Sequence, residues 1–315
     1  MGEKSWKGHL SMLVACIIWG LMSPIGKDAM INGISGFAMV IFRVTGATLF
    51  FWITSLFMPN EHVKTRDMVL FFFASLLSIV FNQCSFTIGL SLTSPINASI
   101  VTTTSPIITM IVAAIYLKEP VTGKKVMGIF LGALGALILI LGSATAGHMD
   151  SSLEGDLLCF LAQFSFSCYL SIFKNLISKY NVITSMKWMF MYASICLVPF
   201  SYNELNSLNW NAIPVRVWLD TSFVVFGGTY IAYILMMMAQ KILRPTIISM
   251  YNYVQPIVAT VVSVAVGLGT FGWTKGIAVI LVFYGVWLVT QSKSRVQMEK
   301  EKQNLSPSKN KRLQK

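Results

Sequence analysis

Long apolar stretches dominate the chain, and short polar or Pro/Gly-bearing connectors separate them. A hydrocarbon core about 30 Å thick is crossed by roughly 20 residues of α-helix. Measured against this length, the pattern predicts ten membrane-spanning helices: Leu10–Met30, Gly36–Phe57, Met68–Leu90, Pro95–Leu117, Val126–Ser143, Gly155–Ile177, Thr184–Phe200, Val217–Gln240, Thr246–Val266 and Lys275–Ser292. The sequence lacks the alternating ten-residue segments of an outer-membrane barrel. We therefore expect an all-α integral membrane protein.

The composition favours a membrane protein over a soluble one. Of 315 residues, 55% are hydrophobic and 11% are charged, whereas soluble domains carry about 25% charged residues. This excludes a cytosolic globular enzyme, a disordered chain and a small secreted scaffold. The five cysteines all lie in apolar stretches without a CxxC pair, which indicates inert thiols rather than a disulfide or zinc framework. No small-residue cleavage site follows the first apolar stretch, so we interpret it as a retained helix.

The net charge of +12 reports topology. With a cytoplasmic N-terminus, the cytoplasmic segments carry 20 of the 24 Lys and Arg residues and the outer loops carry three. Basic residues favour the cytoplasmic side, so we expect both termini in the cytoplasm. The basic tail, residues 293–315, fits a solvated segment near anionic headgroups. We expect no nucleic-acid partner.

The chain resembles itself at a shift of 150 residues. Pro95 and Pro106 align with Pro245 and Pro256, and both pairs are eleven residues apart. At a shift of 147, Lys27 aligns with Lys174. Partners lie five helices apart, and because five is odd, the two copies have opposite orientations. Inverted repeats of this kind are typical of alternating-access transporters. We expect repeats over 8–146 and 153–292.

Specific stretches identify a family. The run "NQCSFTIGLSLTSPINASIVTTTSPIITMIVAAIYLKEP" followed by "GKKVMGIFLGALGALILILG" resembles the end of an EamA domain, and "AYILMMMAQKILRPTIISMYNYVQPIVATVVS" with "GIAVILVFYGVWLV" repeats it. Tandem EamA domains are typical of the ten-helix drug/metabolite transporter superfamily. Arg43 resembles an arginine often found early in its second helix. Glu119 matches the family's Glu after the fourth helix, whereas the second copy reads Gly-Leu-Gly at 267–269. The resemblance implies export of small metabolites, often amino acids or their relatives.

Polar residues within the spans predict the substrate site, because such residues should face the bundle or a water-filled cavity. Thr102–Ser105 precede Pro106 in the fourth helix, and Tyr251, Asn252 and Gln255 precede Pro256 in the ninth. Each proline frees the carbonyl four residues back. We predict a midplane site between these helices, lined by Thr102, Ser105, Tyr251, Asn252 and Gln255, with Pro106 and Pro256 as hinges or fixed bends. The alternative is a structural kink whose hydroxyls bond back to their own helix.

Other polar and aromatic residues extend the predicted site to the first, third, sixth and eighth helices. The deep amides are Asn82, Gln83 and Gln163, which can bind a zwitterion or a hydroxyl but can equally bridge two helices. The aromatic candidates are Trp19, Tyr169, Tyr230, Tyr233 and Tyr251. These rings can wall a cavity or belong to the packing and the interfacial belt.

Arg43 is the one charge well inside a predicted span, and it can attract a carboxylate or clamp neighbouring carbonyls. Asp28 lies at the outer end of the first helix, and no Asp or Glu lies deep in any predicted span. Proton-coupled carriers commonly use a deep carboxylate. We therefore expect facilitated export, or coupling through a peripheral group such as Asp28.

Two other classes fit the sequence poorly. An intramembrane enzyme needs carboxylate pairs, an HExxH site or a Ser/His pair, but the histidines lie in flanks and loops at His9, His62 and His148. A channel needs repeated filter glycines or rings of charge, and a single-chain inverted repeat supplies neither. We expect a bacterial inner-membrane carrier without metal or cofactor, whose partners are a small-molecule substrate and the bilayer. Uptake or multidrug export stays open, as does monomer or homodimer.

Overall fold

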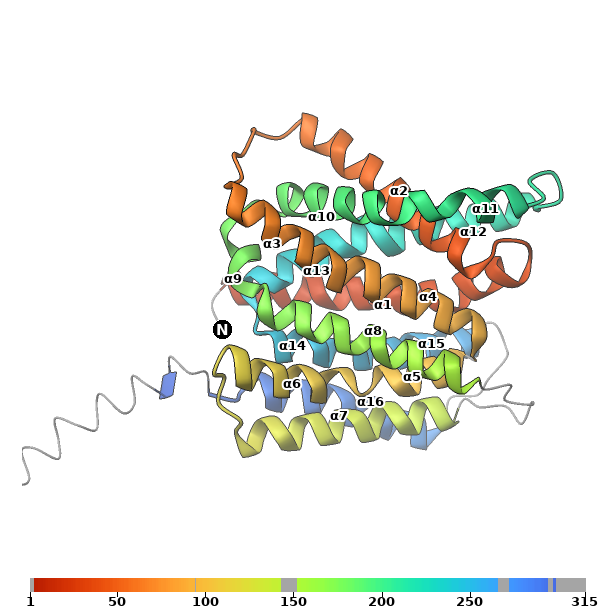
Figure 1. Cartoon of the computed structure of the whole chain (residues 1–315). Coiled ribbons are helices and arrows are strands. Elements are labelled where there is room, and N and C mark those ends of the chain that lie inside the picture. The colour runs from red at the N-terminus through yellow and green to blue at the C-terminus, as the bar shows by residue number, and fades with distance from the viewer. Residues whose placement is uncertain (1–2, 94, 143–151, 266–271, 294–296, 299–315) are drawn as a thin grey trace, which may run out of the picture.

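The computed structural model describes residues 3–93, 95–142, 152–265, 272–293 and 297–298, and across these ranges the regular elements are all helices (Figure 1). The first half contains α1 (Glu3–Ile31), α2 (Gly36–Leu56), α3 (Thr65–Ser75), η1 (Leu76–Phe81), α4 (Asn82–Leu92), α5 (Pro95–Thr102), α6 (Ser105–Tyr116) and α7 (Gly123–Gly142). The second contains α8 (Leu153–Ile172), α9 (Lys174–Lys179), α10 (Val182–Leu197), η2 (Val198–Phe200), α11 (Ser201–Ser207), α12 (Val215–Val225), η3 (Phe226–Ile231), α13 (Ala232–Ile242), α14 (Pro245–Met250), η4 (Tyr251–Tyr253), α15 (Val254–Ala265) and α16 (Trp273–Thr290).

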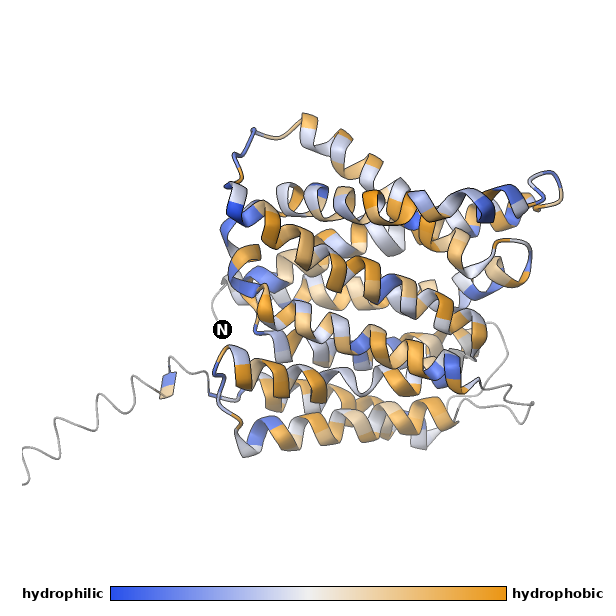
Figure 2. Ribbon diagram, in the orientation of Figure 1, coloured by the Kyte–Doolittle hydropathy of each residue, from blue (hydrophilic) through white to orange (hydrophobic). Residues whose placement is uncertain are grey.

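Nine helices in these ranges are long and apolar enough to cross a bilayer. They correspond to nine of the ten expected spans. The described part of the remaining expected span, Thr246–Val266 (the ninth along the chain), is divided among α14, η4 and α15 and is not one of these nine helices. Figure 2 shows hydrophobic residues along the helices and hydrophilic residues in the loops at the two ends of the bundle. The all-α membrane fold is thus confirmed for the described chain, whereas ten helices and the side of the termini stay predictions.

The two halves share a pattern of helical breaks. The series α3, η1, α4 and the series α12, η3, α13 have boundaries offset by 150 residues throughout. Both η1 and η3 are single stretches of π-helix, a wide turn that is rare and is frequent at functional sites. Each half therefore has a π-helical turn at the equivalent position of its own third long helix.

Contacts at the two ends of helix α1 show how the equivalent helices α4 and α13 are oriented relative to each other. Near its start, Gly8 faces Ile242 and Leu243 at the end of α13. Near its end, the Lys27 Nζ donates to the Leu90 carbonyl oxygen at 2.7 Å and to the Thr93 carbonyl oxygen at 3.2 Å, at the end of α4. The equivalent helices α4 and α13 therefore end at opposite ends of α1 and run in opposite directions (Figure 1).

Lys174 repeats the role of Lys27 in the second half. Its Nζ donates to the carbonyl oxygens of Gln240, at 3.5 Å, and Leu243 at the end of α13. Carbonyls at a helix C-terminus lack intrahelical partners, and an ammonium group there also favours the helix dipole. Each half thus uses one lysine to close the end of its own third long helix.

Close backbone contact holds α7 against α16. A Cβ on Gly128 would lie 2.6 Å from the Gly285 carbonyl oxygen, and one on Gly285 would lie 2.5 Å from the Gly128 carbonyl oxygen. Only glycine allows this approach.

The end of α16 lies beside the start of α1, where Arg244 Nη2 donates to the Ser292 carbonyl oxygen at 2.9 Å.

Candidate functional site

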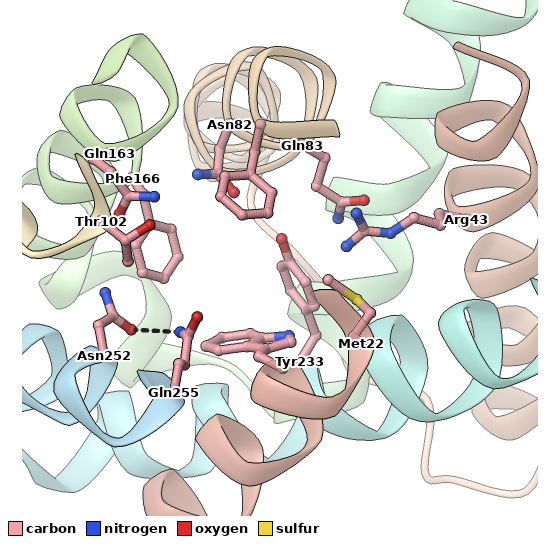
Figure 3. A pocket seen from close by; sticks show the side chains of 12 residues that line it. Met22, Arg43, Asn82, Gln83, Thr102, Gln163, Phe166, Tyr233, Asn252 and Gln255 are labelled. Carbon is pink, nitrogen blue, oxygen red and sulfur yellow. Dashed lines mark hydrogen bonds between the residues drawn. The ribbon is translucent and has the colours of Figure 1, made fainter. Parts of the chain in front are cut away.

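A cavity of about 70 Å³ lies between the two halves, where segments of both converge (Figure 3). By the measure that about 10–15 Å³ holds one water molecule, it has room for about five to seven waters. The lining residues come from α1, α2, α4, α5, α8, α13, η4 and α15: Trp19, Met22, Arg43, Asn82, Gln83, Phe86, Thr102, Gln163, Phe166, Tyr233, Asn252 and Gln255.

The two π-helices position residues of both halves at the cavity. Asn82 and Gln83 follow η1 directly, and Tyr233 comes two residues after η3. Gln83 and Tyr233 are equivalent at the 150-residue shift. Figure 3 shows the Tyr233 hydroxyl below the two amides, and it donates to the Ser78 carbonyl oxygen of η1 at 3.3 Å. The repeated wide turn therefore aims one polar side chain from each half at the same cavity.

The helices with the prolines break at the cavity. Between α5 and α6, the Thr103 and Thr104 amides donate to the carbonyl oxygens of Ile100 and Val101, in tight i−3 turns of 3.0 Å each. In the second half, a 3₁₀ turn, η4, interrupts the helix at the equivalent place. Pro106 and Pro256 are both buried just after these breaks, where the proline N cannot donate to the carbonyl of residue i−4.

Amide groups form a connected patch on one side of the cavity. Gln255 Nε2 donates to Asn252 Oδ1 at 3.3 Å, and Asn252 Nδ2 donates to Ser105 Oγ at 3.3 Å (Figure 3). Across the cavity, Asn82 Nδ2 donates to the Ala162 carbonyl oxygen at 2.9 Å, so this amide also bridges α4 to α8. Each amide keeps further donor or acceptor capacity for a ligand.

Arg43 occupies the opposite side of the cavity and is 4% exposed. Its Nε donates to Thr229 Oγ1 and its Nη1 donates to Thr87 Oγ1, both at 3.0 Å. These hydroxyls belong to η3 and α4, so the guanidinium joins both halves at the edge of the cavity. Both partners are neutral.

Comparisons with known proteins agree with this architecture. The family model of EamA-like transporters matches residues 6–141 and 153–291. The chain belongs to the EamA-like transporter family. Among its relatives, uncharacterized transporter YyaM of Bacillus subtilis is 25% identical over 64% of this chain and 67% of its own length. A WAT1-related protein of Arabidopsis thaliana is 22% identical over 90% of this chain and 84% of its own length.

A solved structure supports the fold of this EamA-like transporter. A crystal structure superposes with a TM-score of 0.71 over 90% of this chain and 96% of that chain, at 15% identity. At this identity the likeness concerns the fold alone.

The structure brings many of the site residues predicted from the sequence of this EamA-like transporter to one cavity. The members of its lining that the sequence singled out are Trp19, Arg43, Asn82, Gln83, Thr102, Gln163, Tyr233, Asn252 and Gln255. Thr102 contributes its side chain, but its hydroxyl donates to the Ala98 carbonyl oxygen at 2.8 Å. This is the back-bonding arrangement that the sequence left open.

Other predicted residues lie outside the lining. Ser105 is fully buried behind Asn252. Tyr169 is fully buried and donates to Gln240 Oε1 at 2.9 Å, and the Tyr230 hydroxyl lies 2.5 Å from Thr54 Oγ1. The Tyr251 hydroxyl bonds His9 Nδ1 at 2.8 Å, and Asp28 forms an ion pair with Arg216 at 3.1 Å, near the end of α1. These tyrosines satisfy their hydroxyls in helix packing.

The apolar part of the lining includes residues that the sequence interpretation missed. Met22, Phe86 and Phe166 lie three, four and three residues after Trp19, Asn82 and Gln163. Residues at these spacings share a helix face. The sequence therefore contained a signal for these residues. Each predicted polar or aromatic residue marks the helix face that lines the cavity, and the residue three or four positions later lies on the same face.

A second polar cluster of the EamA-like transporter lies where α9, α13, α14 and the start of α7 meet the loop after α6. Lys125 Nζ pairs with Glu119 Oε2 at 2.9 Å, and Thr246 Oγ1 donates to the same carboxylate oxygen at 3.4 Å. Burial lowers the pKa of Lys174 to about 8, partly opposed by the nearby Glu119 charge. Burial also lowers the pKa of Arg244. This cluster joins the two halves away from the cavity.

Proposed function

We propose that this chain exports a small organic metabolite, an amino acid or a related compound, across the bacterial inner membrane by alternating access. The carrying observation is the cavity between the halves, lined by amides from both (Asn82, Gln83, Gln163, Asn252 and Gln255). In an apolar bundle such groups are retained where they face a ligand or water. The lining segments lie near the middle of their helices, where transporter sites are expected.

The opposed directions of α4 and α13 support the alternating-access mechanism. If the repeats over 8–146 and 153–292 have inverted topology, the cavity can open to one side of the membrane in one conformation and to the other side in the equivalent conformation. The matching lysine contacts, Lys27 at the end of α4 and Lys174 at the end of α13, fit such a pair. In this proposal Pro106 and Pro256 fix the bends around which the halves move.

The proposed topology has ten spans with both termini in the cytoplasm. The start of α1 and the end of α16 lie at one end of the bundle, as an even number of spans requires. The bias of Lys and Arg supports assigning this end to the cytoplasm. The proposed cytoplasmic tail, 293–315, lies almost entirely outside the described residues. The proposal includes no reaction on the substrate and no cofactor.

Export is proposed to be facilitated, or coupled through a peripheral carboxylate. The twelve lining residues include no Asp or Glu, and Asp28 lies near the end of α1 in an ion pair with the exposed Arg216. A proton relay through the cavity would need a group that binds and releases protons there.

Efflux from proteoliposomes tests the proposal. Vesicles preloaded with labelled amino acids and related organic acids, with and without a pH gradient, are compared for the wild type, Asn252→Ala and the exposed control Asn206→Ala. We expect saturable efflux that Asn252→Ala reduces at least tenfold and Asn206→Ala leaves unchanged. Equal efflux by the wild type and Asn252→Ala would contradict the site. Efflux abolished without a proton gradient and lost on changing a lining residue would contradict the coupling proposal.

A further inference from the structure

Arg43 is a buried cation without a counter-ion. It is 4% exposed, and no ion pair among the described parts of the chain includes it. Two hydroxyls, Thr87 Oγ1 and Thr229 Oγ1, accept from its Nη1 and Nε. A guanidinium has five N–H donors, so most of its hydrogen-bonding capacity and its whole charge are unmatched by these contacts. A buried charge is costly unless an opposite charge pairs with it.

Gln83 is the second unmatched group at the same place. Its side chain is 2% exposed, and neither its amide nitrogen nor its amide oxygen makes a hydrogen bond of good geometry among the described atoms, although the Tyr233 hydroxyl lies beside this amide. Figure 3 shows this amide and the Arg43 guanidinium pointing toward each other at one side of the cavity. Buried polar groups are ordinarily hydrogen-bonded, and exceptions call for an explanation. A ligand with an oxygen that accepts from the Arg43 guanidinium and from Gln83 Nε2, and with a hydroxyl that donates to Gln83 Oε1, supplies one.

The charge of the lining defines the ligand further. Arg43 is its sole charged member, and Asn252, Gln255, Gln163 and Thr102 form a neutral polar group on the other side (Figure 3). A monoanion would bring the occupied cavity to neutrality, whereas a zwitterion would leave the arginine charge uncompensated and add an ammonium with no carboxylate to meet it. The walls between are apolar, with Phe86 and Phe166 among them.

We propose that the cavity takes a small monocarboxylate with a neutral polar body. The carboxylate accepts from the Arg43 guanidinium and the Gln83 amide, in the forked geometry that arginine favours for carboxylates. The body of the ligand lies between the aromatic walls and meets the Asn252 and Gln255 amides. This inference rests on the proposed transport function and narrows its substrate to the acidic relatives of amino acids, such as 2-hydroxy acids.

Thermal unfolding of the purified full-length protein tests the charge argument without transport. Gln83→Glu places a carboxylate beside Arg43, so we expect it to raise the midpoint temperature by a few degrees. Asn82→Asp is the matched change in the same cavity, at an amide already bonded to the Ala162 carbonyl oxygen, and it should lower the midpoint. The surface change Asn206→Asp should leave it unchanged. A midpoint lowered by Gln83→Glu as much as by Asn82→Asp would overturn the proposal.

A generic carboxylate gives the second arm of the same measurement. Propionate should stabilise the wild type more than sodium chloride at equal ionic strength, and this difference should disappear in Gln83→Glu. Stabilisation by both salts alike, or an undiminished propionate effect in Gln83→Glu, would overturn the proposal. Because Arg43 also binds two threonines and its removal can impair folding, Gln83 carries the test.

Transport separates this inference from the proposed function. Proteoliposomes loaded with 2-hydroxy-3-methylbutanoate, valine or valinol, each corrected for protein-free vesicles, present a monoanion, a zwitterion and a cation of one shape. We expect the hydroxy acid to leave fastest, to leave faster when a potassium diffusion potential makes the interior negative, and to lose at least tenfold in Gln83→Glu. Faster efflux of valine or valinol overturns the inference but keeps the transporter. Efflux of none of the three counts against the proposed function, while the thermal result still decides the charge argument.

Discussion

The two proline breaks occupy equivalent positions in the two halves but use their polar residues differently. Before Pro106, the hydroxyls of Thr102, Thr103 and Thr104 donate to carbonyl oxygens of their own helix at 2.8, 2.6 and 2.7 Å. Before Pro256, Asn252 and Gln255 bond each other and line the cavity. The hydroxyls of the first break therefore bond to their own helix, whereas the second break presents amides to the cavity. The repeats share a helical break before a proline, but they differ in whether its polar side chains bond to their own helix or to one another at the cavity.

The lysine contacts show the opposite behaviour. Lys27 and Lys174 both reach carbonyl oxygens at the end of the third long helix of their own half. Here the side chain itself is retained at both positions, because the unpaired carbonyls of a helix end are a backbone property that any sequence must satisfy. Comparing the halves therefore separates groups that stabilise the fold from groups that line the cavity.

The largest expected effect comes from replacing the equivalent residues of the two breaks, Asn252 and Thr102, one at a time. Asn252→Ala should reduce transport about 10- to 100-fold, since a lost hydrogen bond to a buried partner costs about 1–3 kcal/mol. Thr102→Val, at the equivalent position, removes a hydroxyl that bonds its own helix and should cost less than about threefold by the same reasoning. Efflux rates at equal protein density in vesicles measure both. Equal losses would show that the two breaks contribute alike.

The second break also depends on space left by Gly132. A Cβ there would lie 2.6 Å from the Tyr253 ring, whose hydroxyl donates to the Thr103 carbonyl oxygen at 3.1 Å. Gly132→Ala should therefore displace the 3₁₀ turn and destabilise the protein by about 1–3 kcal/mol. Gly123→Ala, in the same helix α7 and with nothing within 4 Å, is the control and should be neutral or slightly stabilising. Thermal midpoints in detergent give the comparison, and equal midpoints would refute it.

Removing either lysine should destabilise its own half to a similar extent. Lys27→Met leaves the carbonyl oxygens of Leu90, Ser91 and Thr93 without this donor, and Lys174→Met does the same for those of Gln240 and Leu243. We expect a loss of about 1–2 kcal/mol in each case, measured as a lowered midpoint. A loss confined to one lysine would mean that the two contacts are equivalent in geometry only.

Much of the fold follows from the sequence, because spanning length and apolar composition are local properties. The apolar pattern located nine spans that the structure contains. The cavity was partly predictable: deep amides such as Asn252 are expensive in lipid and so indicate an interior surface. The positions of the tyrosines were not, since Tyr169 and Tyr251 satisfy their hydroxyls on partners 71 and 242 residues away. The π-helices that aim Gln83 and Tyr233 have no signature in the apolar pattern.

The smallest expected effect concerns the pH dependence of the Lys174 contact. Lys174 lies in α9, after the sixth span ends at Ile172, and burial lowers its pKa from 10.5 to about 8. As pH rises from 7 to 9, the folded protein releases this proton while the unfolded chain keeps it. The unfolded state then binds more protons, so stability rises with pH. The gain should be about 1 kcal/mol over this interval.

The contact itself survives this titration, because a neutral amine keeps two N–H donors for the carbonyl oxygens of Gln240 and Leu243. The stability advantage of the wild type over Lys174→Met should therefore grow between pH 7 and 9, and comparing the two cancels the titrating groups that do not interact with Lys174. Thermal midpoints of both proteins at matched ionic strength measure this difference. If the advantage shrinks with pH, the ammonium charge holds the end of α13. If it grows, the hydrogen bonds hold it, and the charge is a cost of placing a lysine in the buried junction between the halves.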